Sequence, residues 1–119
     1  MVDRLAEGFA ALRHTYVGRL GPEVGALCRN WVLFRIEADS AAAERFRQGI
    51  HRLCGSGATF GFPRLSDTAR EIEDILDGSA EGGSPLDGIK LARMETLLAT
   101  LIRITGDIEQ HPDEAAEGS

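Results

Sequence analysis

His51 is the residue of this chain best suited to nucleophilic chemistry. Its segment is amphipathic, and at about 100° per residue the apolar side chains form one narrow stripe, while His51 points roughly 140° away from it. The stripe consists of Phe46, Ile50, Leu53, Gly57 and Phe60. A neutral imidazole has a free lone pair near neutral pH, because its unperturbed pKa is about 6.5. An imidazole that projects away from the core is therefore a candidate nucleophile.

The neighbours of His51 on the helical wheel differ in size and charge; they are Glu44, Arg47, Gly55 and Ala58. Gly55 and Ala58 have almost no side chain, so they leave space for another protein to reach the imidazole. Arg47 lies one turn before His51, where a guanidinium could bind phosphoryl oxygens, while Arg52 points further round the helix and is the weaker candidate. The alternative interpretation is an ordinary solvated surface, with Gly55 kept for tight helix packing.

The sequence that begins at His51 contains a recognisable motif. Its residues are His51-Arg52-Leu53-Cys54-Gly55-Ser56, Phe60-Gly61, Leu65, Ala69-Arg70 and Ile72-Glu73. This stretch resembles the histidine-containing phosphotransfer (HPt) family, whose pattern is His-x-Leu-Lys-Gly-Ser, a later glycine, a leucine and an Ala-x-x-Leu/Ile-Glu helix. The agreement is close over residues 51–73 and extends as a helix pattern over about residues 5–109. Cys54 departs from the pattern, because the family has a lysine three residues after the histidine.

The resemblance implies a fold and a function. HPt domains are antiparallel helical bundles in which an exposed histidine accepts a phosphoryl group from one receiver-domain aspartate and passes it to another. The implied partners are receiver domains of response regulators and of a hybrid sensor histidine kinase. No cofactor is expected on this chain, since the divalent metal, expected to be magnesium, would sit on the partner's receiver domain. Together with the wheel geometry, this makes His51 the expected phosphoacceptor, and the expected phosphoryl-stabilising or partner-contacting residues are Arg47, Arg52, Cys54, Gly55 and Ala58.

Other polar residues have weaker signals. Cys54 is expected to be a small, half-buried filler; in the redox alternative, the nearby Arg47 would lower the pKa of its thiol. Glu73 is expected on the helix surface, where it could help to orient the site. His14 and His111 belong to no motif, and the spacing of histidines and cysteines matches no zinc signature.

Length and composition indicate one globular domain. The chain has 119 residues, of which 43% are hydrophobic and 27% charged, and its net charge of −6 disfavours nucleic acid as a partner. There is no apolar run long enough for a membrane span and no signal-peptide layout at the first residues. Cys28 and Cys54 are expected to be reduced thiols rather than a disulfide. We therefore expect a cytoplasmic monomer.

Helical periodicity predicts an all-α protein. Apolar residues recur at helical spacing over about residues 3–20 and again to about residue 37, with Gly21-Pro22 expected to break or kink the helix between them. Asp39-Ser40 is expected to cap the histidine helix, at about residues 40–58. The stripe of the first helix is Leu5, Phe9, Leu12, Tyr16 and Leu20.

The second half of the chain predicts two further helices. Pro63 is expected to open a helix over about residues 63–77, and Ser84-Pro85 to cap a last one over about residues 86–108. Its inward-facing residues are expected to be Ile89, Met94, Leu97, Leu98, Leu101, Ile104 and Ile108. The expected fold is an antiparallel up-down four-helix bundle over residues 1–109, with an additional N-terminal helix or helical extension. Residues 110–119 are expected to form a disordered tail, because the sequence is mostly polar from Glu109 onward.

Three function classes fit a helical bundle with an exposed histidine. The favoured one is a phosphocarrier of a multistep phosphorelay, without an ATP-binding or kinase domain. A histidine-kinase dimerisation domain is disfavoured, because such domains usually continue after the histidine with Glu/Asp-x-x-Asn/Thr-Pro, whereas Arg52 and Cys54-Gly55 follow here. The third is a non-catalytic helical adaptor that binds receiver domains without taking the phosphoryl group.

Overall fold

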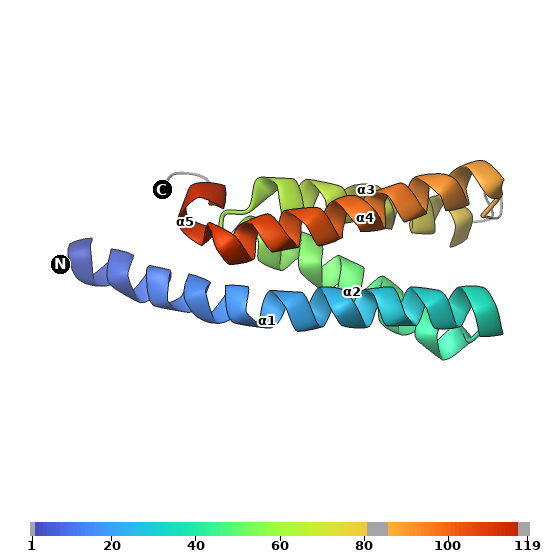
Figure 1. The fold of residues 1–119 in the computed structure, drawn as a ribbon, viewed down its shortest axis with the longest axis horizontal. Helices are drawn as coiled ribbons and strands as arrows, with labels where there is room; N and C mark the ends of the chain where they lie inside the picture. The colour runs from blue at the N-terminus through green and yellow to red at the C-terminus, as the bar shows by residue number, and fades with distance from the viewer. Residues whose placement is uncertain (1, 81–85, 117–119) are drawn as a thin grey trace.

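The computed structural model describes residues 2–80 and 86–116, and it is all-α. Four long helices pack as an antiparallel bundle, and a short fifth helix follows them (Figure 1). They are α1 (Val2–Glu37), α2 (Ser40–Thr59), α3 (Pro63–Ala80), α4 (Gly88–Gln110) and α5 (Pro112–Ala115). α2 packs against α1 and α3, and α4 closes the bundle against α1 and α3. The predicted four-helix bundle with an N-terminal helical extension is confirmed.

α1 is one continuous helix of 36 residues with Pro22 inside it, so the predicted break at Gly21-Pro22 is wrong. Proline removes one backbone hydrogen bond and crowds the preceding turn, but it does not end a helix that packing holds in place. Leu20 and Val24 on either side are buried in the core and supply that packing. Figure 1 shows the two halves of α1 running in slightly different directions, which agrees with the other predicted outcome, a kink.

The N-terminal part of α1 projects beyond the bundle. Leu5 and Leu12 are exposed there, although they continue the apolar stripe that Tyr16 and Leu20 bury. The bundle ends near Phe60, whose carbonyl oxygen accepts a hydrogen bond from Arg13 Nε at 3.2 Å. None of the described helices therefore covers Leu5 and Leu12.

α2 and α3 begin and end close to the predicted positions. Asp39 is the N-cap of α2, and its Oδ1 accepts a hydrogen bond from Ala42 N at 3.0 Å. Gly61 has a φ of 83°, which favours glycine, and it turns the chain from α2 into α3. Pro63 is the first residue of α3. These local signals are short-range, which is why the sequence predicted them well.

α4 begins at Gly88, where Asp87 Oδ1 accepts a hydrogen bond from Lys90 N at 2.8 Å. The predicted cap at Ser84-Pro85 lies outside the described residues. Ile89 is 83% exposed, so its predicted inward position is wrong. It lies five residues before the buried Met94, which is about 140° round the helix, and Leu91 packs against the core instead. The remaining inward predictions for this helix are confirmed.

The predicted disordered tail differs from the structure over residues 110–116, and residues 117–119 lie outside the described residues. α4 runs on to Gln110, and Pro112 opens the short helix α5. Ala115 packs against the core and Ala116 is buried, so apolar contact holds the chain to the bundle through residue 116.

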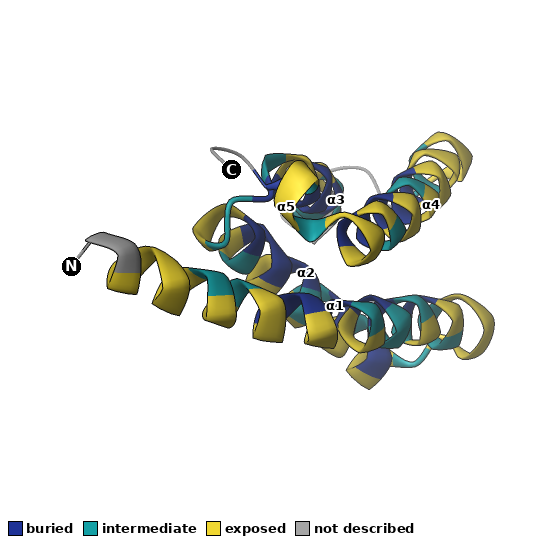
Figure 2. Cartoon of the chain, turned by 60° about the vertical axis from the view of Figure 1, so that its left-hand side comes forward, coloured by how far each residue is buried: buried dark blue, intermediate teal, exposed yellow. Residues whose placement is uncertain are grey.

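The residues coloured as buried lie on the faces where the helices meet (Figure 2). In α2 the predicted stripe is confirmed, with Phe46, Ile50 and Leu53 buried and Phe60 half-buried at the end of the helix. Gly57 allows α3 to approach, because a Cβ there would lie 3.1 Å from Ser66 N. Ser66 Oγ then donates a hydrogen bond to the Cys54 carbonyl oxygen at 2.7 Å. This contact fixes α3 against the exposed histidine's helix. No described helix has the length and apolar character needed to cross a membrane.

Candidate functional site

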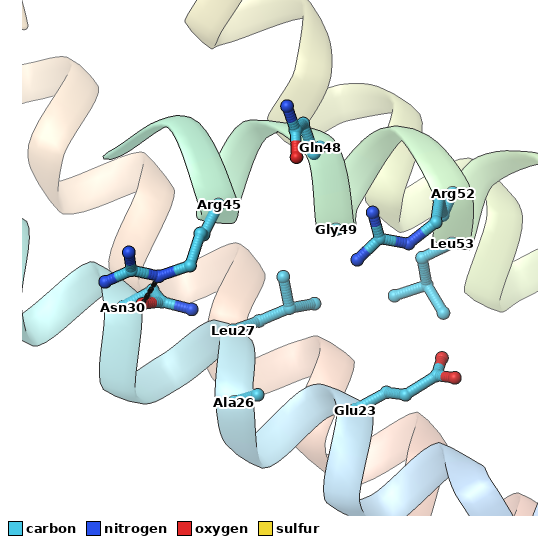
Figure 3. Close-up of a pocket in the computed structure, with 9 residues that line it drawn as sticks. All are labelled: Glu23, Ala26, Leu27, Asn30, Arg45, Gln48, Gly49, Arg52 and Leu53. Carbon is cyan, nitrogen blue, oxygen red and sulfur yellow. Dashed lines mark hydrogen bonds between the residues drawn. The ribbon is translucent and has the colours of Figure 1, made fainter. Parts of the chain in front are cut away.

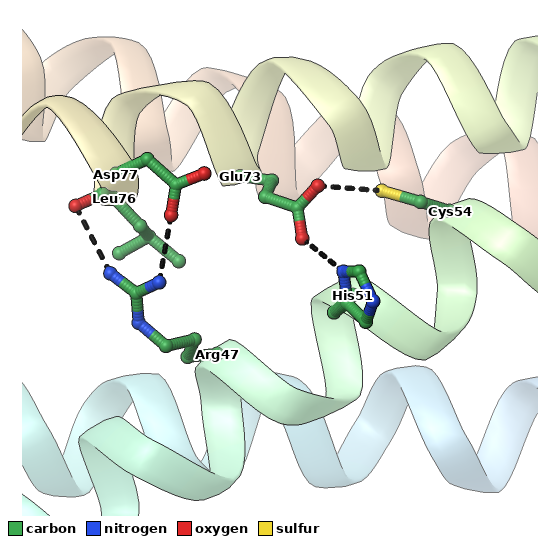
Figure 4. Close-up of polar contacts among 6 residues, drawn as sticks. All are labelled: Arg47, His51, Cys54, Glu73, Leu76 and Asp77. Carbon is green, nitrogen blue, oxygen red and sulfur yellow. Dashed lines mark hydrogen bonds and ion pairs between the residues drawn. The ribbon is translucent and has the colours of Figure 1, made fainter.

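His51 lies on the exposed side of α2 and is held by a carboxylate from α3 (Figure 4). Its Nδ1 is 2.6 Å from Glu73 Oε2, while 76% of its side chain is exposed to solvent. A carboxylate can only accept a hydrogen bond, so the proton of the neutral ring belongs on Nδ1. The lone pair is then on Nε2, the nitrogen that Glu73 does not contact. The arrangement presents a nucleophilic nitrogen in one fixed tautomer.

Glu73 is the main residue whose role the sequence left open. Its Oε2 accepts from His51, and its Oε1 accepts a hydrogen bond from the Cys54 thiol at 3.9 Å (Figure 4). Both carboxylate oxygens therefore have partners on α2, which fixes the direction of the carboxylate. The available signal was the glutamate that closes the matching motif, but only the register between α2 and α3 brings it to the imidazole.

Arg47 lies one turn before His51, and it is tied to the end of α3. Its Nη1 donates to Asp77 Oδ1 at 2.7 Å, and its Nη2 donates to the Leu76 carbonyl oxygen at 3.3 Å (Figure 4). Asp77 was not among the expected site residues. The predicted contact between Arg47 and a phosphoryl group stays a prediction; its two bonds to α3 hold the guanidinium in place, and only its remaining N–H groups are available to a phosphoryl oxygen.

Cys54 is buried, with 6% of its surface exposed, and it fills space between α2 and α3. Burial raises the pKa of its thiol to about 11, and the charge of Glu73 acts in the same direction. The redox alternative, in which Arg47 lowers this pKa, is therefore wrong; Arg70 is the main cation that lowers the pKa, and its effect is smaller than that of burial. The thiol stays protonated at neutral pH. Cys28 and Cys54 are both free thiols.

The surface that follows His51 on α2 is open. Gly55 and Ala58 are exposed, and a Cβ on Gly55 would meet no atom within 4 Å. A shallow hollow on the other side of His51 is lined by Arg47, Gln48, His51, Arg52, Glu73 and Asp77. The imidazole is thus reachable from solvent along both directions of the helix.

A second hollow, of about 260 Å³, lies on the α1 side of α2 and does not include His51 (Figure 3). Arg52 points into it, with Nη2 3.8 Å from the position that a Cβ of Gly49 would take. Arg45 Nε donates there to Asn30 Oδ1 at 3.1 Å. Arg52 also lines the hollow at His51 together with Glu73, so its side chain lies at the boundary between the two hollows. Gly49 is needed here because its missing side chain makes room for Leu27 of α1.

The described residues contain no cluster of three or more histidine, cysteine, aspartate or glutamate side chains that could hold a metal ion. His14 is exposed on α1, and His111 lies between α4 and α5, where its Nδ1 is 3.7 Å from Glu114 Oε2. Neither contacts the residues around His51. Among the three histidines, and counting contacts between described residues, only His51 combines exposure with a short, oriented hydrogen bond.

Comparison with known proteins supplies the family. The sequence model of the Hpt domain matches residues 11–104, a span that contains His51 and Glu73 and most of α1 to α4. No curated protein and no solved structure gave a match. The match covers well over half of the chain, so this protein belongs to the Hpt domain family.

Proposed function

We propose that His51 is the phosphoryl acceptor of this Hpt domain, taking the group from one receiver-domain aspartate and passing it to a second. Membership of the family makes the chain a phosphocarrier of histidine phosphotransfer that interacts with receiver domains. The observation that carries the assignment to His51 is the pairing of its Nδ1 with Glu73 while the rest of the ring stays exposed.

The chemistry follows from this pairing. The Nε2 lone pair attacks the phosphorus of an aspartyl phosphate, the N–P bond forms, and the P–O bond breaks with its electrons leaving on the aspartate carboxylate. The proton on Nδ1 stays in place, so the ring becomes positively charged, and the Glu73 carboxylate stabilises that charge. Transfer to the second receiver domain reverses these steps. No general base is needed, because the attacking nitrogen carries no proton.

The remaining requirements of phosphoryl transfer are in-line approach and neutralisation of the phosphoryl oxygens. We place the divalent metal, magnesium, on the receiver domain together with the aspartate. Response regulators and a hybrid sensor histidine kinase are the proposed sources of these receiver domains. The open surface at Gly55 and Ala58 gives such a partner access to His51.

The test is transfer of label from phosphorylated receiver domains to the full chain. We expect the wild-type protein to acquire an acid-labile, alkali-stable label, as a phosphoramidate does, and His51→Gln to acquire none. His14→Gln is the matched control, because His14 is also exposed on a helix but has no carboxylate partner in the described contacts.

Labelled His51→Gln would overturn the assignment. A wild-type chain that binds a phosphorylated receiver domain but never takes label would instead be the non-catalytic adaptor. The free energy of unfolding of His51→Gln is expected to lie within about 0.5 kcal/mol of wild type, because the side chain is exposed and its removal creates no cavity.

A further inference from the structure

The α2–α3 contacts define a register that continues past His51. Arg47 pairs with Asp77 and His51 pairs with Glu73, so moving one turn forward along α2 corresponds to one turn back along α3. One further turn on each helix places Ala69 opposite Gly55, and Arg70 follows the buried Ala69 on the exposed side of α3. Glu73, which contacts both His51 and Cys54, is three residues from Arg70 and therefore shares its face of α3.

Arg70 has a free guanidinium at this position. It is exposed, and in the described part of the chain it forms no ion pair and no side-chain hydrogen bond, although Asp67 and Asp74 lie within one turn of it on α3. Its positive charge acts on Cys54 of α2, because it lowers the pKa of the thiol while burial raises that pKa. The open surface of Gly55 leaves room for the arginine to extend toward His51.

The other arginines near His51 are placed differently. Arg47 donates hydrogen bonds from two of its nitrogens to Asp77 and to the Leu76 carbonyl oxygen. The guanidinium of Arg52 extends over Gly49 on the α1 side of α2, although its side chain also lines the hollow at His51. Cys54, at the position where the family pattern has a lysine, is uncharged and buried.

We propose that Arg70, reaching across from α3, binds the phosphoryl oxygens on His51 and so supplies the cation that Cys54 does not. A guanidinium offers two parallel N–H groups that match the oxygens of a phosphoryl group. The cation thus comes from the helix that also carries Glu73, which puts the two charges that act on phosphohistidine on one face of α3. This inference rests on the proposed function of His51.

The experiment measures phosphohistidine on the full chain in two ways. Label is taken either from a phosphorylated receiver domain or from phosphoramidate, a small donor that needs no docking surface, and the half-life of the label is then followed after the donor is removed. Arg70→Ala is compared with Arg64→Ala, which removes an exposed arginine of the same helix two turns away. We expect Arg70→Ala to lower the labelling rate with both donors or shorten the half-life by about tenfold, and Arg64→Ala to behave as wild type.

Two further variants separate charge from structure. Arg70→Lys keeps a cation and is expected to recover most of the lost rate, and Cys54→Lys in the Arg70→Ala background is expected to restore it from the opposite helix. If wild type is labelled on His51 but Arg70→Ala matches Arg64→Ala with both donors, Arg70 has no such role and the proposed function still stands. If wild type takes no label from either donor, the proposed function itself fails, and this inference fails with it.

Discussion

Two of the ion pairs between α2 and α3 lie one turn apart, and they differ in which donor and acceptor atoms they leave available. The Arg47–Asp77 and His51–Glu73 contacts have nearly equal lengths, 2.7 Å and 2.6 Å. Arg47 uses a second nitrogen on a backbone carbonyl and is only 36% exposed, whereas His51 is 76% exposed. In the first contact both terminal nitrogens of Arg47 are hydrogen-bonded to α3. In the second contact only Nδ1 of His51 is bonded, and Nε2 stays available.

The Arg47–Asp77 contact therefore stabilises the packing of α2 on α3, whereas the His51–Glu73 contact orients the imidazole. Removal of Arg47 should mainly lower the free energy of unfolding, because the described partners of Arg47 belong to α3. Removal of Glu73 should be felt mainly in the chemistry of His51, because Glu73 sets the tautomer and balances the charge of the ring. The predictions below test that division.

Replacement of Glu73 should have the largest effect. We expect Glu73→Ala to lower the rate of phosphoryl transfer to His51 by about a hundredfold, within the range known for groups that handle a proton or charge at a reacting centre. Glu73→Gln keeps a hydrogen-bond acceptor without the charge and should lie between Glu73→Ala and wild type. Glu71→Ala is the control, because Glu71 pairs with Arg93 at 2.7 Å elsewhere on α3. Equal rates for the Glu73 and Glu71 variants would contradict the orienting role.

A side chain at Gly55 should reduce transfer by about tenfold, or about 1.4 kcal/mol on the barrier. No atom lies within 4 Å of the position of its Cβ, so Gly55→Gln should keep or raise the melting temperature while obstructing a docking partner.

Gly57→Ala gives the opposite control for that experiment. Its Cβ would lie 3.1 Å from Ser66 N, so the melting temperature should fall. A Gly55→Gln protein with normal transfer kinetics would show that the partner docks on another surface.

Arg47→Ala should lower the free energy of unfolding by about 1 kcal/mol or less, as is typical of partly exposed ion pairs. The transfer rate should change by less than about threefold, or about 0.7 kcal/mol on the barrier. Chemical denaturation and transfer kinetics on the same variant check both parts. A tenfold slower transfer with unchanged stability would restore the original sequence-based prediction that Arg47 contacts the phosphoryl group.

The buried thiol of Cys54 should affect the stability of the protein only at alkaline pH. Its pKa is raised in the folded protein from the ordinary value of 9.0 to about 11, so the folded state holds this proton more tightly than the unfolded chain does. The resulting stabilisation is present below about pH 9 and is lost as the pH rises toward about 11. Melting temperatures of wild type and Cys54→Ala, measured from pH 7 to pH 11, should therefore converge; a parallel decline would refute this linkage.

The sequence predicted best what depends on one helix alone. The periodicity around Ile50 and Leu53 predicted both the buried face of α2 and the exposure of His51, because each follows from the helical repeat. Asp39 and Pro63 were identified from local capping and first-turn preferences. Ile89 was misplaced because an apolar residue near a helix end need not keep the phase of the core stripe.

The contacts between helices were harder to predict. Nothing in the local sequence of Glu73 or Asp77 says which α2 residue each will meet, since that depends on the relative positions of two helices. The continuity of α1 through Pro22 depends in the same way on the packing of Leu20 and Val24 against other elements. Single-chain periodicity carries no information on such distances.

The turn from α2 to α3 has a consequence for insertions and deletions. Gly57 O accepts from Phe62 N at 2.8 Å, Phe62 O accepts from Ser66 N at 3.1 Å, and Gly61 has the positive φ between them. Surface turns ordinarily tolerate a change of length. Here one added residue would leave both helices amphipathic but rotate and shift α3, carrying Glu73 away from His51. Natural chains that use this pair of residues should therefore vary in length elsewhere and keep the number of residues between the imidazole and the carboxylate constant.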